Sequence, residues 1–541
     1  MAKPYGGKIG NHFRLGNSQI EDDDEDITIV EGQITGGMDS QSDPVVIPTS
    51  RLTVAQGVRN RFGITFRRDG TVKLDPTKPN SSAVLDFYYF KKHAGTEHLI
   101  RFDQDKLYKR GAASWTEITG AGLTGTDVDR FSIVTAFDQL VFSNNGVEKI
   151  QVVNAGTTTY AALGNAPKYK YITAFYNRIV GAYYNEATPN PVQIGWSGDG
   201  NITEWDPLTD PSAGSGPLIE SPEDVADHIT GIFSLSSQLV VLRERSIFVA
   251  TKQPIASQPF SFYCDVPGLG CNCPWSAQVV PGGIIYADAA TRSVYVYSPG
   301  QAPKVISTPV ERSIFDGLAV PNTAFSSYDK LTKEYSLAIP TTFGGDVNVW
   351  TYNFNTDSWV YDVRPSTITC ISDVGALSSD ISVDALTGTV DSLTGTVDAL
   401  GVTSSRASVR VYGFSDGNIY REVEGAWYDY GTGLYSGTAF DSYFTSKCVT
   451  LPLHCNAIKA LILSVRATSG FSAVLQFSPD NGGWYNLKTS TSYDSSVITI
   501  SHREFIRCRK FKWRLIILGG GRFEVLHYKV VGNRITDAFT S

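Results

Sequence analysis

One serine lies in a pattern that is used for nucleophilic catalysis. Residues 413–417, Gly-Phe-Ser-Asp-Gly, match the G-x-S-x-G sequence that in hydrolases places a reactive serine on a sharp strand-to-helix turn. Here "VRVYG" precedes the pattern and "NIYREV" follows it, and two β-rich runs of this kind predict a hairpin rather than a strand followed by a helix. We therefore expect Ser415 to lie in a turn and to have no catalytic role.

Cysteine and histidine side chains could hold a metal ion. Cys264, Cys271 and Cys273 are the densest group of thiols, but "CNC" lacks the spacer of two to four residues that is typical of zinc-binding motifs. The nearest histidine, His228, lies 36 positions before Cys264, and no H-E-x-x-H pair occurs in the chain. We expect buried free thiols and no metal site, and the role of this cysteine cluster stays open.

A further pattern points towards sugar chemistry. Residues 478–484, Ser-Pro-Asp-Asn-Gly-Gly-Trp, resemble the Asp-box turn of sialidase-type propellers, with one residue fewer before the tryptophan. A sialidase also needs arginines from several blades, whereas Arg59, Arg61, Arg67 and Arg68 lie in one short segment. Because a phosphate-binding glycine loop is missing as well, we predict no catalytic residue, no cofactor and a binding or structural role rather than an enzyme.

The elements that must position these residues are hairpins that recur along the chain. Each consists of two short β-rich runs around a turn, and the turns include Asn-Gly and Asp-Gly pairs, which permit the positive φ of two-residue loops. The hairpins begin near Leu99, Leu140, Ile179, Leu239, Ile284, Tyr335 and Val409. Their basic spacing of about 40 to 50 residues is that of a four-stranded propeller blade, which buries its faces by stacking in a ring. The sequence predicts an all-β fold with a β-propeller of about six to eight blades.

The propeller is expected over residues 51–430, between an N-terminal arm over residues 1–50 and a C-terminal β-sandwich of seven strands over residues 431–541. An insertion near residues 371–405 contains a seven-residue repeat, 383–400. Glycines within each heptad disfavour a helix, so we expect a projecting loop or a short helix rather than a coiled coil.

Three segments are candidate interfaces with other subunits or partners. They are Glu21, Asp22, Asp23 and Asp24 in an acidic run, Val390 and Leu393 in the insertion, and Lys510, Lys512 and Arg514 in a predicted strand. In that strand the cations alternate with apolar residues, so they share one face and could dock on an acidic partner. An acidic run and a cationic row can equally be ordinary solvated surface, and the sequence leaves both interpretations open.

Composition limits the class of protein. Lys and Arg number 46 against 54 Asp and Glu, a net charge of −8, which argues against a strongly basic reader of nucleic acid. Apolar residues at 42% can build a core, and no apolar run approaches the length of a membrane-spanning helix. The N-terminus has no hydrophobic signal region, so we expect the protein to be made and assembled in a cytoplasm.

Residues 140–207 resemble the central region of the tail hub or nozzle proteins of short-tailed bacteriophages, also called packaged-DNA stabilisation proteins or tail tubular protein B. The motifs that carry the resemblance are "VFSNNG…KI", "AP" at 166–167, "FYNRIVGAY" at 175–183 and "WSGDGNITEW" at 196–205. Further similarities are "YNFNTDSWV" at 352–360 and the closing "RFEVLHYKVVG". The insertion at 383–400 departs from the family.

The resemblance implies a structural protein of the virion tail, assembled in the bacterial host cytoplasm. Such a protein forms a homo-oligomeric ring, usually a hexamer, below the portal and the head-to-tail adaptor protein, and it contacts tail fibre or needle proteins. Double-stranded DNA passes through the ring without sequence-specific contacts, and the ring helps to retain the packaged genome. An acidic or neutral lining suits a conduit because strong phosphate contacts would hinder sliding. The alternative is a carbohydrate-binding or carbohydrate-degrading propeller of a receptor-binding apparatus. Blade number, subunit number and orientation relative to the capsid are not determined by the sequence.

Overall fold

The computed structural model shows a nearly all-β protein that divides into two compact units. It describes residues 26–111, 114–219, 222–318, 320–341, 345–375, 408–423, 426, 428–432, 437–440, 442–452, 455–467, 472–491, 496–502, 506–518 and 523–534. The sandwich unit comprises Met1–Val72, Trp350–Val363 and Val423–Ser541, and the propeller unit comprises Lys73–Val349 and Arg364–Glu422. Within the described residues, no helix is long and apolar enough to cross a membrane.

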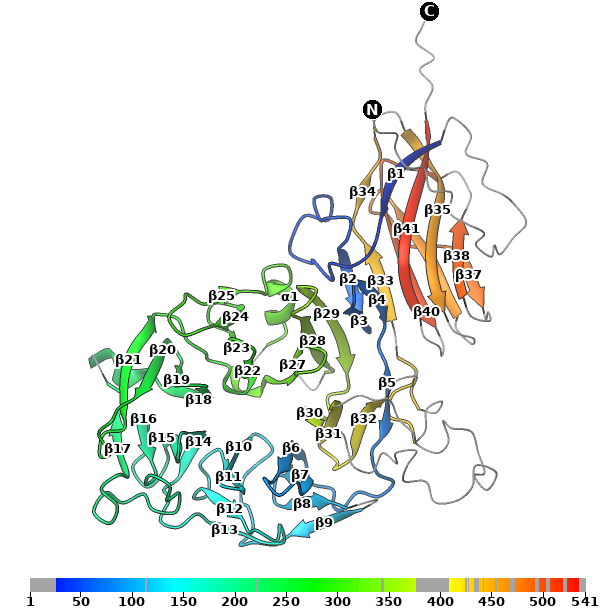
Figure 1. The fold of residues 1–541 in the computed structure, drawn as a ribbon. Coiled ribbons are helices and arrows are strands. Elements are labelled where there is room, and N and C mark those ends of the chain that lie inside the picture. The colour runs from blue at the N-terminus through cyan, green and yellow to red at the C-terminus, as the bar shows by residue number, and fades with distance from the viewer. Residues whose placement is uncertain are drawn as a thin grey trace, which may run out of the picture. The chain divides into compact units, whose positions relative to one another are not determined.

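The propeller unit is built from successive antiparallel sheets of four strands (Figure 1). The first three sheets contain β6 (Val84–Lys91), β7 (Glu97–Asp103), β8 (Leu107–Arg110) and β9 (Trp115–Ile118); β10 (Phe131–Ala136), β11 (Gln139–Asn144), β12 (Gln151–Val153) and β13 (Tyr160–Ala162); and β14 (Tyr169–Phe175), β15 (Arg178–Tyr184), β16 (Asn190–Trp196) and β17 (Gly214–Pro217). The next two contain β18 (Ile229–Leu235), β19 (Gln238–Arg243), β20 (Ser246–Lys252) and β21 (Phe260–Pro267); and β22 (Gln278–Val280), β23 (Gly283–Asp288), β24 (Ser293–Tyr297) and β25 (Lys304–Val305).

Two further sets of four strands complete the series, so that seven sets follow one another in the described part of the chain. One set is β26 (Phe325–Asp329), β27 (Glu334–Pro340), β28 (Val347–Asn353) and β29 (Ser358–Arg364), and the other is β30 (Ile368–Gly375), β31 (Ser408–Phe414) and β32 (Ile419–Val423) with β5 (Gly70–Lys73) as its outer strand. In the division into two units, most of β28, β29 and β5 falls in the sandwich unit. Each predicted hairpin start lies in the second strand of one set, which confirms the repeat inferred from the sequence.

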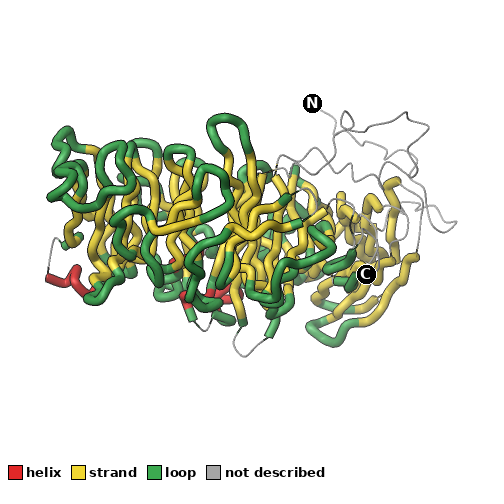
Figure 2. The backbone as a smooth tube through the Cα atoms, turned by 90° about the horizontal axis from the view of Figure 1, so that it is seen from below, coloured by secondary structure: helices red, strands yellow, loops and turns green. Residues whose placement is uncertain are grey.

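The first strands of these sets are arranged around a ring, and most neighbouring pairs contact each other. Strand β6 lies beside β10, β10 beside β14, β14 beside β18, β22 beside β26, and β26 beside β30, which in turn lies beside β6. The short helices occur in links from the last strand of one set to the first strand of the next, and Figure 2 shows them on one side of the propeller. They are η1 (Pro222–Ala226), η2 (Pro274–Ser276), α1 (Glu311–Phe315) and η3 (Pro321–Thr323). The structure therefore shows the predicted β-propeller.

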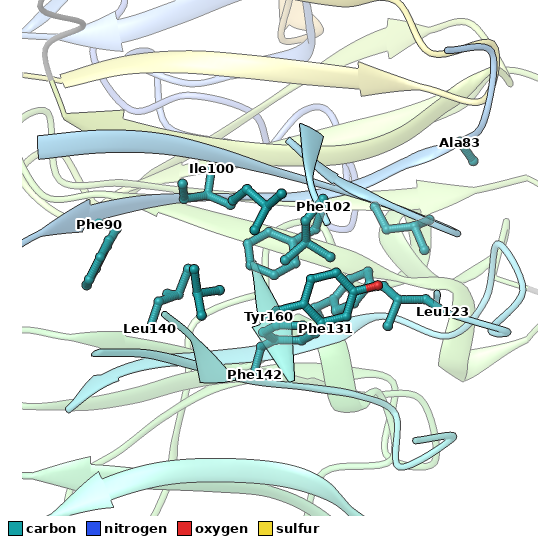
Figure 3. Packing of buried hydrophobic residues seen from close by; sticks show 13 residues of the cluster. Ala83, Phe90, Ile100, Phe102, Leu123, Phe131, Leu140, Phe142 and Tyr160 are labelled. Atoms are coloured by element: carbon teal, nitrogen blue, oxygen red, sulfur yellow. The ribbon is translucent and has the colours of Figure 1, made fainter. Parts of the chain in front are cut away.

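Each sheet buries its faces against its neighbours. Between β6–β9 and β10–β13, the rings of Phe102, Phe131, Phe142 and Tyr160 fill the gap (Figure 3). The Phe102 and Phe131 centroids are 5.0 Å apart, and Phe142 meets Phe102 edge to face at 5.4 Å. Large apolar surfaces in these tilted arrangements are the main source of stability in such a core. Comparable clusters lie between the following sheets.

The sandwich unit contains two packed sheets. One has the order β3 (Val58–Arg61), β4 (Ile64–Arg67), β41 (Phe523–Arg534), β35 (Cys455–Ala467), β38 (Ser496–His502), with β1 (Asp26–Gly32) on β41 and β39 (Ile506–Arg507) on β35. The other continues the ten-stranded sheet that begins with β26–β29, in the order β29, β2 (Leu52–Gln56), β33 (Ser442–Ser446), β40 (Lys510–Leu518), β36 (Ser472–Pro479), β37 (Tyr485–Thr491), with β34 (Val449–Thr450) on β40. Trp513 of β40 packs on Tyr528 of β41, with ring centroids 5.4 Å apart, so the two sheets share a core.

The N-terminal boundary differs from the division expected from the sequence. The sequence predicts an arm over residues 1–50 and a propeller from residue 51, but β1 pairs with β41, and β2, β3 and β4 are strands of the sandwich sheets. Strands β1, β2 and β4 have partners that lie hundreds of residues later in the chain. A local pattern cannot identify such partners, because strand pairing at long range depends on the completed fold.

Candidate functional site

The predicted cationic row lies on β40. Phe511, Trp513 and Leu515 are buried, whereas Lys510 is exposed and Lys512 and Arg514 are half-buried, so the expected alternation of faces is confirmed. The other predicted interface residues, Glu21, Asp22, Asp23 and Asp24 and also Val390 and Leu393, lie outside the described residues. The structure therefore locates the row but does not show what it meets.

Arg514 is held in place by its own sheet. Its Nε and Nη2 atoms donate hydrogen bonds to Gln476 Oε1, at 3.0 and 2.6 Å, and its guanidinium lies 4.4 Å from the centroid of a Trp484 ring. A guanidinium that is stacked and bidentate loses little further freedom on binding a partner. Arg514 can thus act as a rigid part of the row beside the exposed Lys510.

The turn that resembles an Asp box has a structural task. Asp480 and Asn481 have positive φ, at 46° and 61°, which closes the connection between β36 and β37. Asp480 Oδ1 accepts hydrogen bonds from the backbone N–H groups of Arg509 and Lys510, both at 2.8 Å. The turn therefore anchors the start of the cationic strand.

Ser415 lies in a hairpin turn, as predicted. Strand β31 ends at Phe414, β32 begins at Ile419, and Gly417 takes the positive φ of 81° between them. The backbone N–H of Ser415 donates to Thr367 O at 2.8 Å. No nucleophile elbow is formed here, because a strand rather than a helix follows the serine.

The cysteine cluster consists of free thiols. Cys271 and Cys273 are buried and Cys264 is half-buried. Burial raises the pKa of Cys273 to about 12 and raises that of Cys271 as well, so both stay protonated and unreactive at neutral pH. In the described part of the chain, no three His, Cys, Asp or Glu side chains are grouped so that they could hold a metal ion.

The arginines considered for sugar binding belong to the interior of the sandwich unit. Arg59, Arg67 and Arg68 are all at most 2% exposed. The Nε atom of Arg68 lies 2.7 Å from Asp362 Oδ2, and a second ion pair joins Arg68 to Asp429. Buried charges need partners of this kind, so these arginines are used in holding the unit together.

Sequence reasoning missed a cavity in the propeller unit. It has a volume of about 240 Å³ and is lined by residues of all seven first strands of the ring. Arg130 contributes a guanidinium that donates from Nη2 to Thr369 O at 2.8 Å and lies 4.3 Å from the centroid of the Phe325 ring. Asp86, in β6, contributes a carboxyl group.

Asp86 is held in an unusual electrostatic state. Burial raises its pKa to about 6, although a hydrogen bond from Ser372 Oγ at 2.9 Å and another from the backbone N–H of Phe87 at 2.7 Å stabilise the ionised form. The nearby Arg130 acts in the same direction as these hydrogen bonds. The signal in the sequence was a single acid within the apolar run "VLDFYYFK", which a search for known motifs does not register.

Residues 140–207 contribute to the junction between two blades. Buried residues of this segment, among them Val141, Ala166, Ile179 and Trp205, pack in one cluster around Tyr169. The Asn145-Gly146 turn has the positive φ values of 53° and 69° that the sequence required. Part of this segment therefore serves as scaffold that joins β10–β13 to β14–β17, and other residues of it, such as Phe175 and Val180, pack in the next cluster.

No family model and no curated protein matches this sequence. Among solved structures, similar ones include a quinoprotein alcohol dehydrogenase-like protein from Bacteroides thetaiotaomicron, with 9% identity and a TM-score of 0.31 over 53% of this chain and 67% of that one. AztD from Citrobacter koseri has 11% identity and a TM-score of 0.30 over 56% and 82%. An exo-β-1,3-galactanase from Phanerochaete chrysosporium has 12% identity and a TM-score of 0.22 over 92% and 100%.

TM-scores this low say nothing about what the chain binds or does. The strand order and packing define its class by themselves: it is an all-β protein with a propeller and a β-sandwich.

Proposed function

We propose that this protein is a structural component of the virion tail of a short-tailed bacteriophage. In this role it is a tail hub or nozzle subunit that forms a ring, usually a hexamer, below the portal and the head-to-tail adaptor protein. The ring provides the DNA exit conduit, helps to retain the packaged genome and carries tail fibre or needle proteins. The protein acts as an architectural part and not as a catalyst.

The observation that carries this proposal is the resemblance of residues 140–207 to this class of protein, together with the place of these residues in the fold. Several residues of the matching motifs, among them Val141, Ile179 and Trp205, lie in the buried junction of two blades, where Trp205 packs on Tyr169 with ring centroids 5.8 Å apart. Motifs with such a packing role are tied to the architecture, so a resemblance in them bears on the scaffold rather than on a ligand. The net charge of −8 is also suited to a conduit in which DNA must slide.

The cationic row on β40 is the described surface that we assign to contacts between subunits or with a partner. Lys510 is exposed and Lys512 is half-buried, and the chain as a whole is acidic, so a like subunit offers many carboxylates to this row. Contacts of this kind weaken as salt screens them over a Debye length of about 8 Å at physiological ionic strength. The proposal therefore predicts ring assembly that depends on salt.

The test is the mass and shape of the purified protein, alone and with its adaptor. Light scattering should give a closed oligomer, and negative-stain images should show rings with a channel that admits a DNA duplex. A protein that stays monomeric or trimeric in both conditions, and that binds or degrades sugars on a glycan array, contradicts the proposal and supports the carbohydrate-binding alternative.

A double variant, Lys510→Gln with Lys512→Gln, tests the row itself. We expect weaker assembly at low salt and a smaller loss at high salt, while the control Lys304→Gln, on exposed strand β25, assembles normally. An assembly constant that does not change in the double variant removes the row from the interface.

A further inference from the structure

The central cavity of the propeller unit is lined by two side chains of opposite charge that form no ion pair with each other. Among the lining residues of the described chain, Asp86 and Arg130 are the two that carry full charge at neutral pH. Within the described residues neither takes part in an ion pair. The two charges attract each other without forming an ion pair, so each can still bind an opposite charge directly, and the cavity is suited to a ligand with both charges.

Arg130 has unused hydrogen-bonding capacity. A guanidinium has five N–H donors, and the described residues accept one hydrogen bond from it, the bond from Nη2 to Thr369 O. The Phe325 ring supports the plane of the guanidinium at 4.3 Å, and burial lowers its pKa without removing its charge. A supported, desolvated guanidinium with free donors is a receptor for a carboxylate.

Asp86 is anchored through one oxygen. Its Oδ1 atom accepts the hydrogen bonds from Ser372 Oγ and Phe87 N, whereas no described residue donates to Oδ2. The carboxyl group is therefore fixed in orientation, and its second oxygen is free to accept from an ammonium group.

The remaining walls combine aromatic and aliphatic side chains with the polar side chains of Ser132, Gln278 and Ser326. Tyr171 and Trp275 contact each other with ring centroids 5.6 Å apart, and both line the cavity. Thr230 adds a buried hydroxyl oxygen that has no partner among the described residues. The cavity thus offers aromatic rings for packing together with polar groups that can orient a small molecule.

We propose that this cavity is a binding site for a small zwitterion of the α-amino-acid type with an apolar side chain. Its carboxylate is bound by Arg130, its ammonium group by Asp86, and its side chain packs against Tyr171 and Trp275. A simple carboxylate would leave the charge of Asp86 without a partner, and a simple amine would do the same to Arg130. This inference is independent of the proposed tail function.

Calorimetric titration with three related probes tests the site. They are L-phenylalanine, 3-phenylpropanoate, which lacks the ammonium group, and 2-phenylethylamine, which lacks the carboxylate. We expect L-phenylalanine to bind at least tenfold more tightly than either of the others. The proposal is overturned if L-phenylalanine shows no saturable binding up to tens of millimolar, or if 3-phenylpropanoate binds as tightly as L-phenylalanine.

Two variants assign the contacts. Arg130→Gln should weaken L-phenylalanine and 3-phenylpropanoate alike, at least tenfold, whereas Asp86→Asn should weaken L-phenylalanine and 2-phenylethylamine but not 3-phenylpropanoate. The matched control is Arg312→Gln, because that side chain is 79% exposed on α1. Near-ultraviolet circular dichroism checks folding, and Arg130→Lys replaces Arg130→Gln if the latter does not fold. Unchanged affinity for L-phenylalanine in a folded Arg130 variant refutes the assignment.

Discussion

The glycines around Tyr169 give a prediction whose size follows from the structure. Tyr169 is 1% exposed and lies at the junction of β10–β13 with β14–β17. A Cβ atom added to Gly195, in β16, would fall on Tyr169 Oη, with Tyr169 Cζ at 2.8 Å. A Cβ atom added to Gly181, in β15, would meet the base of the same ring, with Cδ2 at 2.5 Å and Cγ at 2.6 Å. Both positions therefore require glycine because of the ring and not because of backbone conformation.

Gly195→Ala and Gly181→Ala should each destabilise the protein by about 1–3 kcal/mol, the cost of inserting a methyl group into a packed core. For domains of a few hundred residues this corresponds to about 2–4 °C in thermal midpoint per kcal/mol. The control is Gly216→Ala in β17 of the same sheet, where an added Cβ meets nothing within 4 Å. That control should remain within about 0.5 kcal/mol of the wild type.

A second substitution separates the two clashes. Tyr169→Phe removes the hydroxyl oxygen that opposes Gly195→Ala, so it should relieve part of that penalty; the Cζ contact at 2.8 Å remains. Tyr169→Phe keeps the ring atoms that clash with the new methyl group of Gly181→Ala. The stability losses of Tyr169→Phe and Gly181→Ala should therefore be additive in the double variant. Double-mutant cycles from urea unfolding measure both couplings. Equal couplings, or a neutral Gly195→Ala, would refute this account of the junction.

Three further predictions concern buried polar groups. Asp429 accepts a hydrogen bond from Nη1 of the buried Arg68 at 2.9 Å, so Asp429→Asn should lower the free energy of unfolding by about 3 kcal/mol. The control Asp316→Asn, at a side chain that is 55% exposed, should lower it by about 0.5 kcal/mol or less. Equal losses of stability in urea unfolding would contradict the role of the buried pair. Because burial raises the pKa of Asp86 to about 6 from 3.8, the folded state retains a proton that the unfolded state releases, so stability falls as pH rises between about 4 and 6. The free energy of unfolding should fall by about 3 kcal/mol over this pH range in the wild type, and Asp86→Asn should lack this fall. Unfolding curves with the same pH dependence in the wild type and the variant would refute this. In native protein at neutral pH, an aromatic disulfide reagent should modify Cys264 first, since the other six cysteines are buried, and fast reaction of Cys271 or Cys273 would contradict the pKa shifts assigned to them.

The repeat of hairpins could be predicted because it is written in short segments. Each start, from Leu99 to Val409, falls in the second strand of a four-stranded set, and the spacing between starts is set by the number of strands in a blade. Turn chemistry was equally local: Asn145, Gly146 and Gly417 have the positive φ that their types permit. The alternation of β40 followed from the two-residue period of a strand.

The amino-acid sequence by itself thus determined the all-β class, the blade repeat and the two faces of the cationic strand, because propensity, turn type and period act over a few residues. Only the tertiary structure decided that β1 to β4 belong to the sandwich, that Arg68 meets Asp362 and Asp429, and that Asp86 and Arg130 line one cavity. These residues are brought together from distant parts of the chain by ring closure and sheet pairing. No local pattern contains that information, since each contact depends on where every intervening blade has been placed.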